Sequence, residues 1–448
     1  METGDATDAV YYVISDLHIG GDEQLEHVEF LDELLAFLES LEATDENAEL
    51  VINGDAFGLW EVTTVDGIAK FDALVERYPE LFEQLRATGR EVTITLLPGN
   101  HDHELAAYDE YVERFAEYNV DVVQAESMTR PVGDREIWFE HGNQRDPNNR
   151  IEDFGNPHAK PLGYYYNTLV TSRAGQVSDR GRRNWLKDIQ AVTPTERVPI
   201  WFLSKYFYHE MNPLLRYAAV PFLLLFNVSV VLAVLVGLDL AGFWSVPSTV
   251  AEAVIGTFGT AGTVFDVLLA VNVVTAALLV LVWIPIHFVL EDFKTSLDRF
   301  GLVETEFTVD ANEPYLSAAS EVFADEPGTA VFCYGHTHRP MVTEHDGGVV
   351  VNTGSWLKRF HRRRVIAGLL PPVFHPTFRL SIVRIAAESE GVVVEYETRE
   401  KDDPAPADLT LTERFLTVGR EPEPDIPDRV VVESPEEYPR EDTTSARR

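Results

Sequence analysis

The first 145 residues alternate between two patterns of apolar and polar positions. Short β-branched and aromatic runs predict strands, and segments whose apolar residues return every three or four positions predict amphipathic helices. The strand-like runs are residues 11–14, 50–52, 92–97 and 137–139. The helical segments are residues 25–41, 68–85 and 105–118. Strands that alternate with helices in this way predict an α/β layer.

The C-terminal part of the chain follows a different pattern. Residues 329–397 consist mostly of strand-like runs rich in β-branched and aromatic residues. These runs are residues 331–334, 348–351, 378–385 and 392–396. Together with the N-terminal layer they predict two packed sheets flanked by helices.

Two long apolar runs lie between these parts. Residues 217–238 form 22 positions without a charged side chain, and residues 267–290 form 24 positions without an acid or a base apart from His287. At 1.5 Å per residue, either run is long enough to cross the ~30 Å hydrocarbon core of a bilayer. We therefore expect a transmembrane hairpin; the alternative interpretation is a pair of buried core helices.

The flanks of the two runs predict how this hairpin is oriented. Eleven Lys or Arg residues lie within 143–216 and two more, Lys294 and Arg299, follow the second run, whereas the connecting loop 239–266 has none. Positively charged flanks stay on the cytoplasmic side of a membrane. We therefore expect a two-pass protein of the cell membrane whose main domain and both termini are cytoplasmic.

The composition narrows the class of protein further. The chain of 448 residues has 74 acidic and 36 basic residues and a net charge of −38, and only seven of its basic residues are lysine. Such acid-rich, lysine-poor chains are typical of halophilic archaea, although a generic acidic enzyme is the alternative. The negative field argues against nucleic-acid binding. A single cysteine, Cys333, excludes an internal disulfide and favours a reducing compartment, and the polar residues 1–8 predict no signal peptide.

Five short motifs carry the side chains suited to catalysis, and most of them directly follow a strand-like run. They are Asp16-Leu17-His18, Gly54-Asp55, Gly99-Asn100-His101-Asp102, His141-Gly142 and Gly335-His336-Thr337-His338. Because the C-terminal ends of parallel strands meet at one edge of a sheet, we expect these side chains to converge. Carboxylate, amide and imidazole ligands suit two divalent ions, Mn first and otherwise Fe, Zn or Co. Two such ions can clamp the attacking and leaving oxygens of a phosphate ester.

In their order, these motifs resemble the pattern DxH…GD…GNH[DE]…H…GHxH of the calcineurin-like metallophosphoesterases. The resemblance covers roughly residues 10–145 and 328–398 and implies the family's four-layer α/β/β/α sandwich. It also implies a role for His101, which would face the scissile phosphate or the leaving group, and for Asp102, which would orient that ring. The implied ligands of one metal ion are Asp16, His18, Asp55 and His338. Those of the other are Asp55, Asn100, His141 and His336, with Asp55 as the bridge.

Further segments suggest a branch of this family. Residues 57–60, 141–143 and 335–340 are similar to the branch that contains UDP-2,3-diacylglucosamine pyrophosphatase, which places a lipid-handling helical insert after its His-Gly motif. This chain departs from it at His101, where that branch often has arginine, so the lipid substrate stays open. Three residues near the last motifs are candidate substrate contacts: Arg339, Asn352 and Ser355.

The predicted organisation has three parts. A metallophosphoesterase domain is split between residues 1–145 and 328–400, an insertion covers 146–327, and the acidic, Pro-rich tail 401–448 is expected to be disordered. Within the second half, the basic run 358–364 either rests on anionic lipid head groups or pairs with the protein's own acids.

The function expected from these features is that of a membrane-anchored dimetal phosphoesterase. Its substrate would be a phosphate mono- or diester or a pyrophosphate, and a lipid-linked substrate at the cytoplasmic membrane surface fits the predicted hairpin. Two alternatives remain open. One is a tethered enzyme that acts on a soluble nucleotide or a phosphoprotein, and the other is a membrane adaptor whose site is vestigial. The expected partners are the lipid bilayer and a phosphoester; the oligomeric state is open.

Overall fold

The computed structural model describes the two parts of the predicted main domain and portions of the segment between them. The described ranges are residues 9–22, 27–171, 197–216, 312–365, 370–401, 409–418 and 426–433, with single residues and short stretches between 173 and 292.

The first sheet has nine strands and contains the N-terminal strand at its middle. Its strands are β1 (Val10–Ile14), β2 (Ala48–Asn53), β3 (Thr93–Leu97), β4 (Asp121–Val122), β10 (Arg359–Val365), β11 (Val373–Glu388), β12 (Gly391–Lys401), β13 (Thr417–Val418) and β14 (Arg429–Val432). Strands β1 to β4 run parallel, and β11 pairs antiparallel with β1. The four parallel strands therefore end at the same edge of the sheet.

The second sheet has five strands in the order β5-β6-β7-β9-β8. Their bounds are β5 (Ser127–Val132), β6 (Arg135–Glu140), β7 (Thr329–Tyr334), β8 (Met341–His345) and β9 (Gly348–Asn352). Strands β6, β7 and β9 are parallel to one another, so their C-terminal ends also share one edge.

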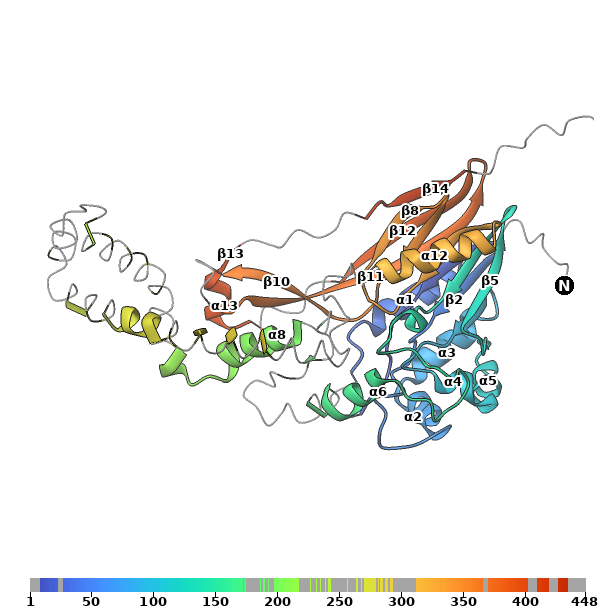
Figure 1. The fold of residues 1–448 in the computed structure, drawn as a ribbon. Helices are drawn as coiled ribbons and strands as arrows, with labels where there is room; N and C mark the ends of the chain where they lie inside the picture. Colours follow the sequence, from blue (N-terminus) through green and yellow to red (C-terminus); the bar gives the residue numbers. More distant parts are fainter. Residues whose placement is uncertain are drawn as a thin grey trace, which may run out of the picture.

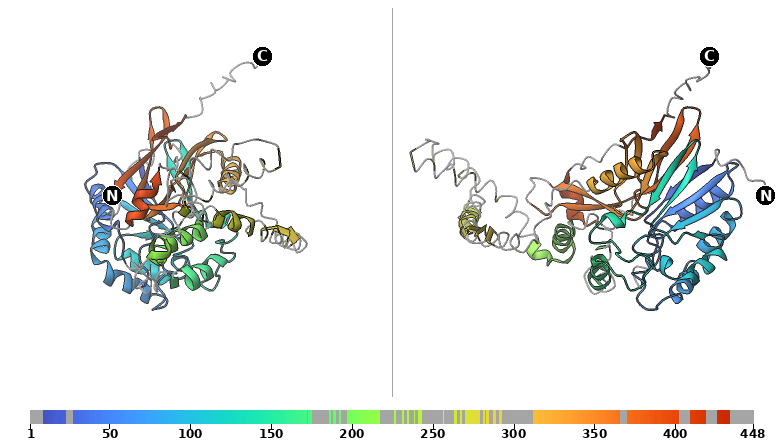
Figure 2. Two further views of the ribbon diagram at one scale, coloured as in Figure 1. Left: turned by 90° about the vertical axis from the view of Figure 1, so that its left-hand side faces the viewer. Right: turned by 45° about the vertical axis from the view of Figure 1, so that its right-hand side comes forward.

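Three apolar cores hold the layers together. The first lies between the first sheet and the helices α1 to α5, the second lies between the two sheets, and the third joins the second sheet to α12. Figures 1 and 2 show this stack of helices, two sheets and one helix. The helices are α1 (Leu31–Glu42), α2 (Ala69–Arg77), α3 (Pro79–Thr88), α4 (Glu104–Ala107), α5 (Asp109–Ala116) and α12 (Glu313–Asp325).

The predicted strands are confirmed, but the predicted helices differ in their bounds. The helix expected over 68–85 is two helices, because Pro79 begins α3 and has no amide hydrogen to continue α2. The helix expected over 105–118 is likewise divided into α4 and α5 at Tyr108, whose backbone is extended. The first helix begins at Leu31, later than the apolar pattern suggests.

The described part of the insertion packs in two places, near the metal-binding motifs and on a long extension of the first sheet. Its elements are the 3-10 helix η3 (Asn143–Arg145), α6 (Leu162–Tyr166), the π-helix η4 (Asn167–Thr171), α8 (Val198–Lys205) and the π-helix η9 (Tyr206–Glu210). Figure 1 shows α8, β10, β13 and α13 (Leu411–Leu416) at the far end of β11. Two small apolar cores, around Trp201 and around Tyr208, join these elements.

The basic run 358–364 forms strand β10 and its entry rather than a loose surface segment. Lys358 pairs with Glu29 at 2.5 Å and with Asp188 at 3.2 Å, so this lysine neutralises the protein's own acids. The arginines of β10 alternate between the two faces of the strand, as a pleated backbone requires.

The two predicted membrane spans, 217–238 and 267–290, lie largely outside the described residues. Among the residues that are described, no helix has the length and apolar character needed to cross a bilayer. Several described helical positions of the second run carry exposed apolar side chains, including Val274, Leu278 and Phe288.

The tail is partly structured, which corrects the expectation of disorder for residues 401–448. Strand β14 pairs antiparallel with β12, with Val392 opposite Val432, and Val432 is buried in the core between the sheets. Helix α13 begins at a capping box in which Thr410 and Glu413 bond each other's backbone amides. The acidic composition of the tail concealed these short apolar segments.

Strand β14 is expected to stabilise the domain measurably. A chain that ends at residue 425 loses the β14 hydrogen bonds and exposes the valines of β12, whereas a chain that ends at residue 433 keeps both. Because burying one valine is worth roughly 1.5–3 kcal/mol, the shorter chain should melt several degrees lower when followed by circular dichroism. Equal melting temperatures would show that β14 adds nothing to stability.

Candidate metal centre

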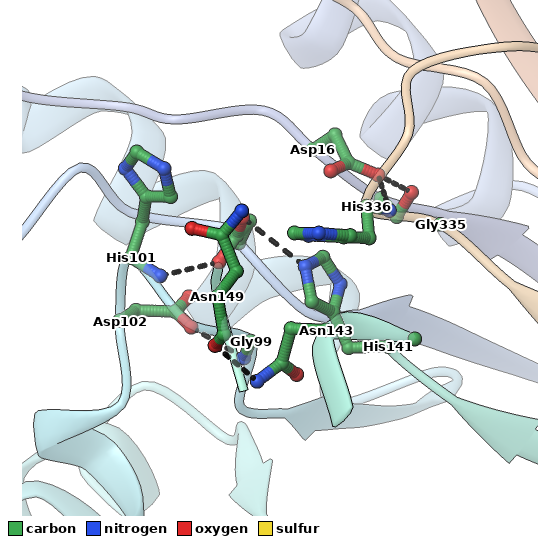
Figure 3. Close-up of polar contacts among 12 residues, drawn as sticks. Asp16, Gly99, His101, Asp102, His141, Asn143, Asn149, Gly335 and His336 are labelled. Atoms are coloured by element: carbon green, nitrogen blue, oxygen red, sulfur yellow. Dashed lines mark hydrogen bonds and ion pairs between the residues drawn. The ribbon is translucent and has the colours of Figure 1, made fainter. Parts of the chain in front are cut away.

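The five motifs meet at the shared C-terminal edge of the two sheets. Asp16, Asp55 and Asn100 follow strands β1, β2 and β3 of the first sheet, while His141 and His336 follow β6 and β7 of the second. Figure 3 shows the side chains of Asp16, His141 and His336 gathered around one region. The sequence therefore placed these residues correctly at one edge.

An unusual backbone conformation carries many of these side chains. Asp16, His18, Asp55, His336 and His338 all have positive φ, between 45° and 61°. This left-handed region is disfavoured for residues with a Cβ and costs about 1–3 kcal/mol per residue unless the surroundings impose it. Its concentration in the motifs indicates that the backbone is bent to aim these side chains.

Two motif glycines are required because candidate ligands lie so close to their Cα atoms that a side chain would not fit. A Cβ added at Gly54, which has φ +88°, would overlap the ring of His141. A Cβ added at Gly99 would overlap the carboxylate and amide of Asp55. Any larger residue at either position would push a candidate ligand out of place.

Asp16, His18 and His338 form the first group of candidate ligands. His338 Nε2 lies 3.0 Å from Asp16 Oδ1 and 3.2 Å from His18 Nε2. Ligands of one ion with bonds near 2.1 Å are about 3.0–3.4 Å apart in octahedral or tetrahedral geometry. The spacing therefore matches two edges of a coordination polyhedron.

Asp55, His141 and His336 form the second group. Oδ2 of Asp55 lies 3.1 Å from His141 Nε2 and 3.6 Å from His18 Nε2, so one oxygen faces both groups. Its other oxygen, Oδ1, accepts the backbone amide of His101 at 2.7 Å. Asp55 thus has the position that a bridging ligand needs.

Outer hydrogen bonds select which ring nitrogen is offered to an ion. His141 Nδ1 donates to the carbonyl of Asn53 at 3.0 Å, which leaves the lone pair on Nε2. His336 Nε2 donates to Asp146 at 3.1 Å, which leaves Nδ1. Although burial favours a neutral acid, the bonds from His336 and Asn149 lower the pKa of Asp146 to about 2.

Several buried atoms at this edge have no hydrogen-bond partner among the described residues. They are Asp16 Oδ1, Asn100 Oδ1 and His141 Nε2. A buried polar atom without a partner is costly, and all three are lone-pair donors to metals. The residues present therefore fit a pair of divalent cations.

The electrostatics of the centre agree with this donor set. Burial and the neighbouring rings of His101 and His338 lower the pKa of His18 to about 3, so its ring is neutral and keeps a lone pair. Burial opposes the charge of His141, but Asp55 and Asp16 outweigh it and raise the pKa of His141 to about 10. The carboxylates thus attract positive charge into the site.

His101 lies beside these groups and is held by residues that the sequence did not reveal. Its Nδ1 bonds Glu61 Oε1 at 2.8 Å, and Asn167 Nδ2 donates to the same oxygen at 2.5 Å. The ring of Trp60 lies 4.4 Å from the ring of His101. Although burial alone would lower the pKa of His101, the charges of Glu61 and Asp55 raise it to about 9.

Among the described residues, the carboxylate of Asp102 makes no hydrogen bond to the ring of His101, and this corrects the role that the resemblance implied. Its Oδ1 accepts the amide of Gly99 at 2.6 Å and its Oδ2 accepts the amide of Phe57 at 3.2 Å. The carboxylate of Asp102 therefore binds backbone amides of the two loops that carry Asp55 and Asn100. Burial and the charge of Asp55 raise the pKa of Asp102 to about 7.

The three candidate substrate contacts have different surroundings. Asn352 is occupied, because its amide donates to Gly335 O at 2.8 Å and to Thr337 Oγ1 at 3.0 Å, so it supports the last motif instead of facing a substrate. Ser355 is buried, and its Oγ has no partner among the described residues. Arg339 is half-buried directly after His338.

Comparison with known proteins identifies relatives of this fold. A family model described as calcineurin-like phosphoesterase matches residues 10–233. A search of curated proteins finds no match.

Among solved structures, a predicted phosphoesterase from Streptococcus pneumoniae TIGR4 is 10% identical to this chain. The match covers 89% of this chain and 93% of that chain, with a TM-score of 0.27. A Vps29 mutant from Entamoeba histolytica is 11% identical, with coverages of 87% and 92% and a TM-score of 0.25. Phosphopantetheinyl hydrolase from Mycobacterium tuberculosis is 12% identical, with coverages of 78% and 91% and a TM-score of 0.26. TM-scores this low support no argument from these structures.

Asp55→Asn should remove metal from the centre without unfolding the protein. The amide keeps the size of Asp55 but loses the charge shared by two cations, so the variant should bind at most one Mn ion per chain by elemental analysis and lose hydrolysis. Asp109→Asn, on the exposed face of α5, is the matched control and should behave like the natural chain. An Asp55→Asn variant with two ions and more than a few per cent of turnover would rule out the bridging role.

Glu61→Ala should lower the turnover number on phosphate esters about 10–100-fold, as loss of a supporting hydrogen bond typically does. The ring of His101 would lose its orientation, while the metal content should be unchanged. The loss should be larger on phenyl than on p-nitrophenyl esters, because a poor leaving group needs the proton more. Glu61→Gln, which keeps an acceptor oxygen, should recover part of the rate, and Glu110→Ala on α5 is the control. Equal losses on both esters would contradict this role.

Proposed function

Because the chain belongs to the calcineurin-like phosphoesterase family, we propose that it is a membrane-anchored metal-dependent phosphoesterase acting on a phosphate ester at the membrane surface. The chain is a hydrolase of phosphoester bonds, and the observation that carries this chemistry is the spacing of 3.0–3.6 Å between the carboxylate oxygens and ring nitrogens at one edge. The membrane anchor and the lipid substrate are the proposal.

The residues divide into two sets of ligands that share Asp55. One set is Asp16, His18, Asp55 and His338, and the other is Asp55, Asn100, His141 and His336. When bound, divalent cations supply an activated water and positive charge for the phosphate oxygens, and Mn is the ion we expect at these mixed oxygen and nitrogen donors.

His101 moves a proton in this scheme. Glu61 holds Nδ1, so Nε2 is the nitrogen that faces the substrate, and the raised pKa of about 9 keeps a proton on the ring near neutral pH. Nε2 then donates that proton to the departing oxygen of the ester. Trp60 lies against the ring and limits its rotation.

Exposed apolar side chains support the membrane part of the proposal. Leu162, Tyr165 and Leu169 of α6 and η4 are half or more exposed, and Tyr164 beside them packs on Trp60 next to His101. Leu214 and Leu215 are also exposed, directly before the first long apolar run. Apolar surface of this extent is typical of contact with a membrane or partner, and the basic flanks favour a site on the cytoplasmic side.

Whether the substrate is a membrane lipid or a soluble ester can be tested with the full-length protein in lipid vesicles in the presence of Mn. It should float with the vesicles and hydrolyse both bis-p-nitrophenyl phosphate and a phospholipid phosphoester. A variant with residues 213–292 replaced by a short Gly/Ser linker should keep the first activity within a few-fold and lose most of the second.

Each contrary result selects a different alternative. If the linker variant hydrolyses both substrates equally, or no lipid ester is turned over, the segment is only a tether for an enzyme with a soluble substrate. If bis-p-nitrophenyl phosphate itself resists hydrolysis, the adaptor with a vestigial site is the better description.

A further inference from the structure

Three arginines from separate elements lie beside the metal centre. Arg339 directly follows the candidate ligand His338, Arg359 begins strand β10, and Arg379 lies in β11. None of the three belongs to the metal-binding motifs. Figure 1 shows β10 and β11, the strands that carry Arg359 and Arg379, continuing past the body of the first sheet.

The register of β11 places Arg379 at the metal edge. Val13 of β1 is paired with Val383 of β11. Strand β1 ends at Ile14, just before Asp16, whereas the paired strand β11 extends beyond this end of β1 toward Val373. Residues two apart in a strand share a face, and Val383 faces the second sheet. Arg379 and Thr377 therefore extend this inter-sheet face beyond the apolar core, to the level of Asp16.

Arg359 lies on the same face, because it is paired directly with Thr377 across the two strands. The hydroxyl of Thr377 is buried and has no hydrogen-bond partner among the described residues. A buried hydroxyl without a partner is costly, and a hydroxyl and a guanidinium side by side can both donate hydrogen bonds to one oxyanion.

Arg339 reaches this face from the second sheet. A side chain at Gly354 would meet Pro340, Ser381 and Tyr396, so these residues surround it. Pro340 is the neighbour of Arg339, and Ser381 lies two residues from Arg379 on the same face. The loop after β7 and strand β11 thus bring arginines together from both sheets.

Two members of this cluster, Arg339 and Arg359, are not neutralised by the residues that the structure describes. In the part of the chain that is described, neither Arg339 nor Arg359 has a carboxylate or hydrogen-bond partner. Burial and the charges of Arg379 and Arg339 lower the pKa of Arg359 to about 10, and the carboxylate that acts on it is Asp16, a candidate metal ligand. Unpaired cations are unexpected in a chain of net charge −38, where acids are abundant.

We propose that Arg339, Arg359, Arg379 and Thr377 form a binding site for a second phosphate group of the substrate, adjacent to the phosphate that the metal centre cleaves. The proposal rests on the phosphoesterase function above and specifies its substrate class, an ester with two neighbouring phosphates such as a diphosphate. Guanidinium groups suit this role because their paired N–H donors match two phosphate oxygens. The metal ligands hold one phosphate, and the arginines would neutralise the other.

A pair of substrates that differ by one phosphate tests the site in the full-length protein. The natural chain and Arg359→Ala are assayed with Mn on bis-p-nitrophenyl phosphate and on P1,P2-di-p-nitrophenyl diphosphate. Arg359→Ala should raise KM for the diphosphate at least tenfold more than KM for the monophosphate diester. Arg359→Lys keeps the charge but not the paired donors, so its KM for the diphosphate should lie between those of the natural chain and Arg359→Ala. Arg364→Ala, exposed on the opposite face of β10, is the control and should leave both KM values unchanged.

The outcomes separate this proposal from the proposed function. No hydrolysis of bis-p-nitrophenyl phosphate by the natural chain would refute the phosphoesterase itself. Hydrolysis with equal KM increases on both substrates in Arg359→Ala would refute a second phosphate site. A lower metal content or melting temperature in both Arg359 variants would also refute it, because it would assign Arg359 a structural role.

Discussion

The crowding of lone-pair donors at one buried edge is the constraint on which the rest of the structure depends. Carboxylate oxygens and ring nitrogens lie 3.0–3.6 Å apart there, and several lack any hydrogen-bond partner among the described residues. Such a set is unfavourable unless cations lie between its members. Strands from both sheets end at this edge, and left-handed backbone at Asp16, Asp55 and His338 turns the side chains inward. The three apolar cores stabilise the fold enough to offset the cost of this strained backbone.

Much of this edge could be predicted from the sequence, because each motif directly follows a short apolar strand. The ligand positions depend only on strand ends and parallel pairing, which local patterns reveal. Helix bounds were less predictable, since Pro79 divides a continuous apolar pattern. Strand β14 was missed for a different reason. Its four residues gain stability only by pairing with β12, a contact that acidic surroundings do not suggest.

The partners of the ligands were the least predictable part of the site. Glu61 reaches His101 across 40 residues, and Asp146 reaches His336 across 190. No local spacing signals these contacts, whereas the adjacent Asp102 is an obvious candidate whose carboxylate is instead bound by two backbone amides. Sequence adjacency thus suggested a partner that the loop geometry excludes. The acid that directly follows Trp60, in a segment close to Asp55, is the local feature that could have drawn attention to Glu61.

The insertion is more than a spacer between two motifs. Its first residues supply Asp146 to His336 and Asn167 to Glu61, so it helps orient one metal ligand and the proton donor. Farther along, α8 and η9 pack on β10 and β11, the strands that carry Arg359 and Arg379. The segment that leads toward the long apolar runs therefore supports the centre on two sides. The orientation of His101 and the positions of Arg359 and Arg379 therefore both depend on contacts that the insertion makes.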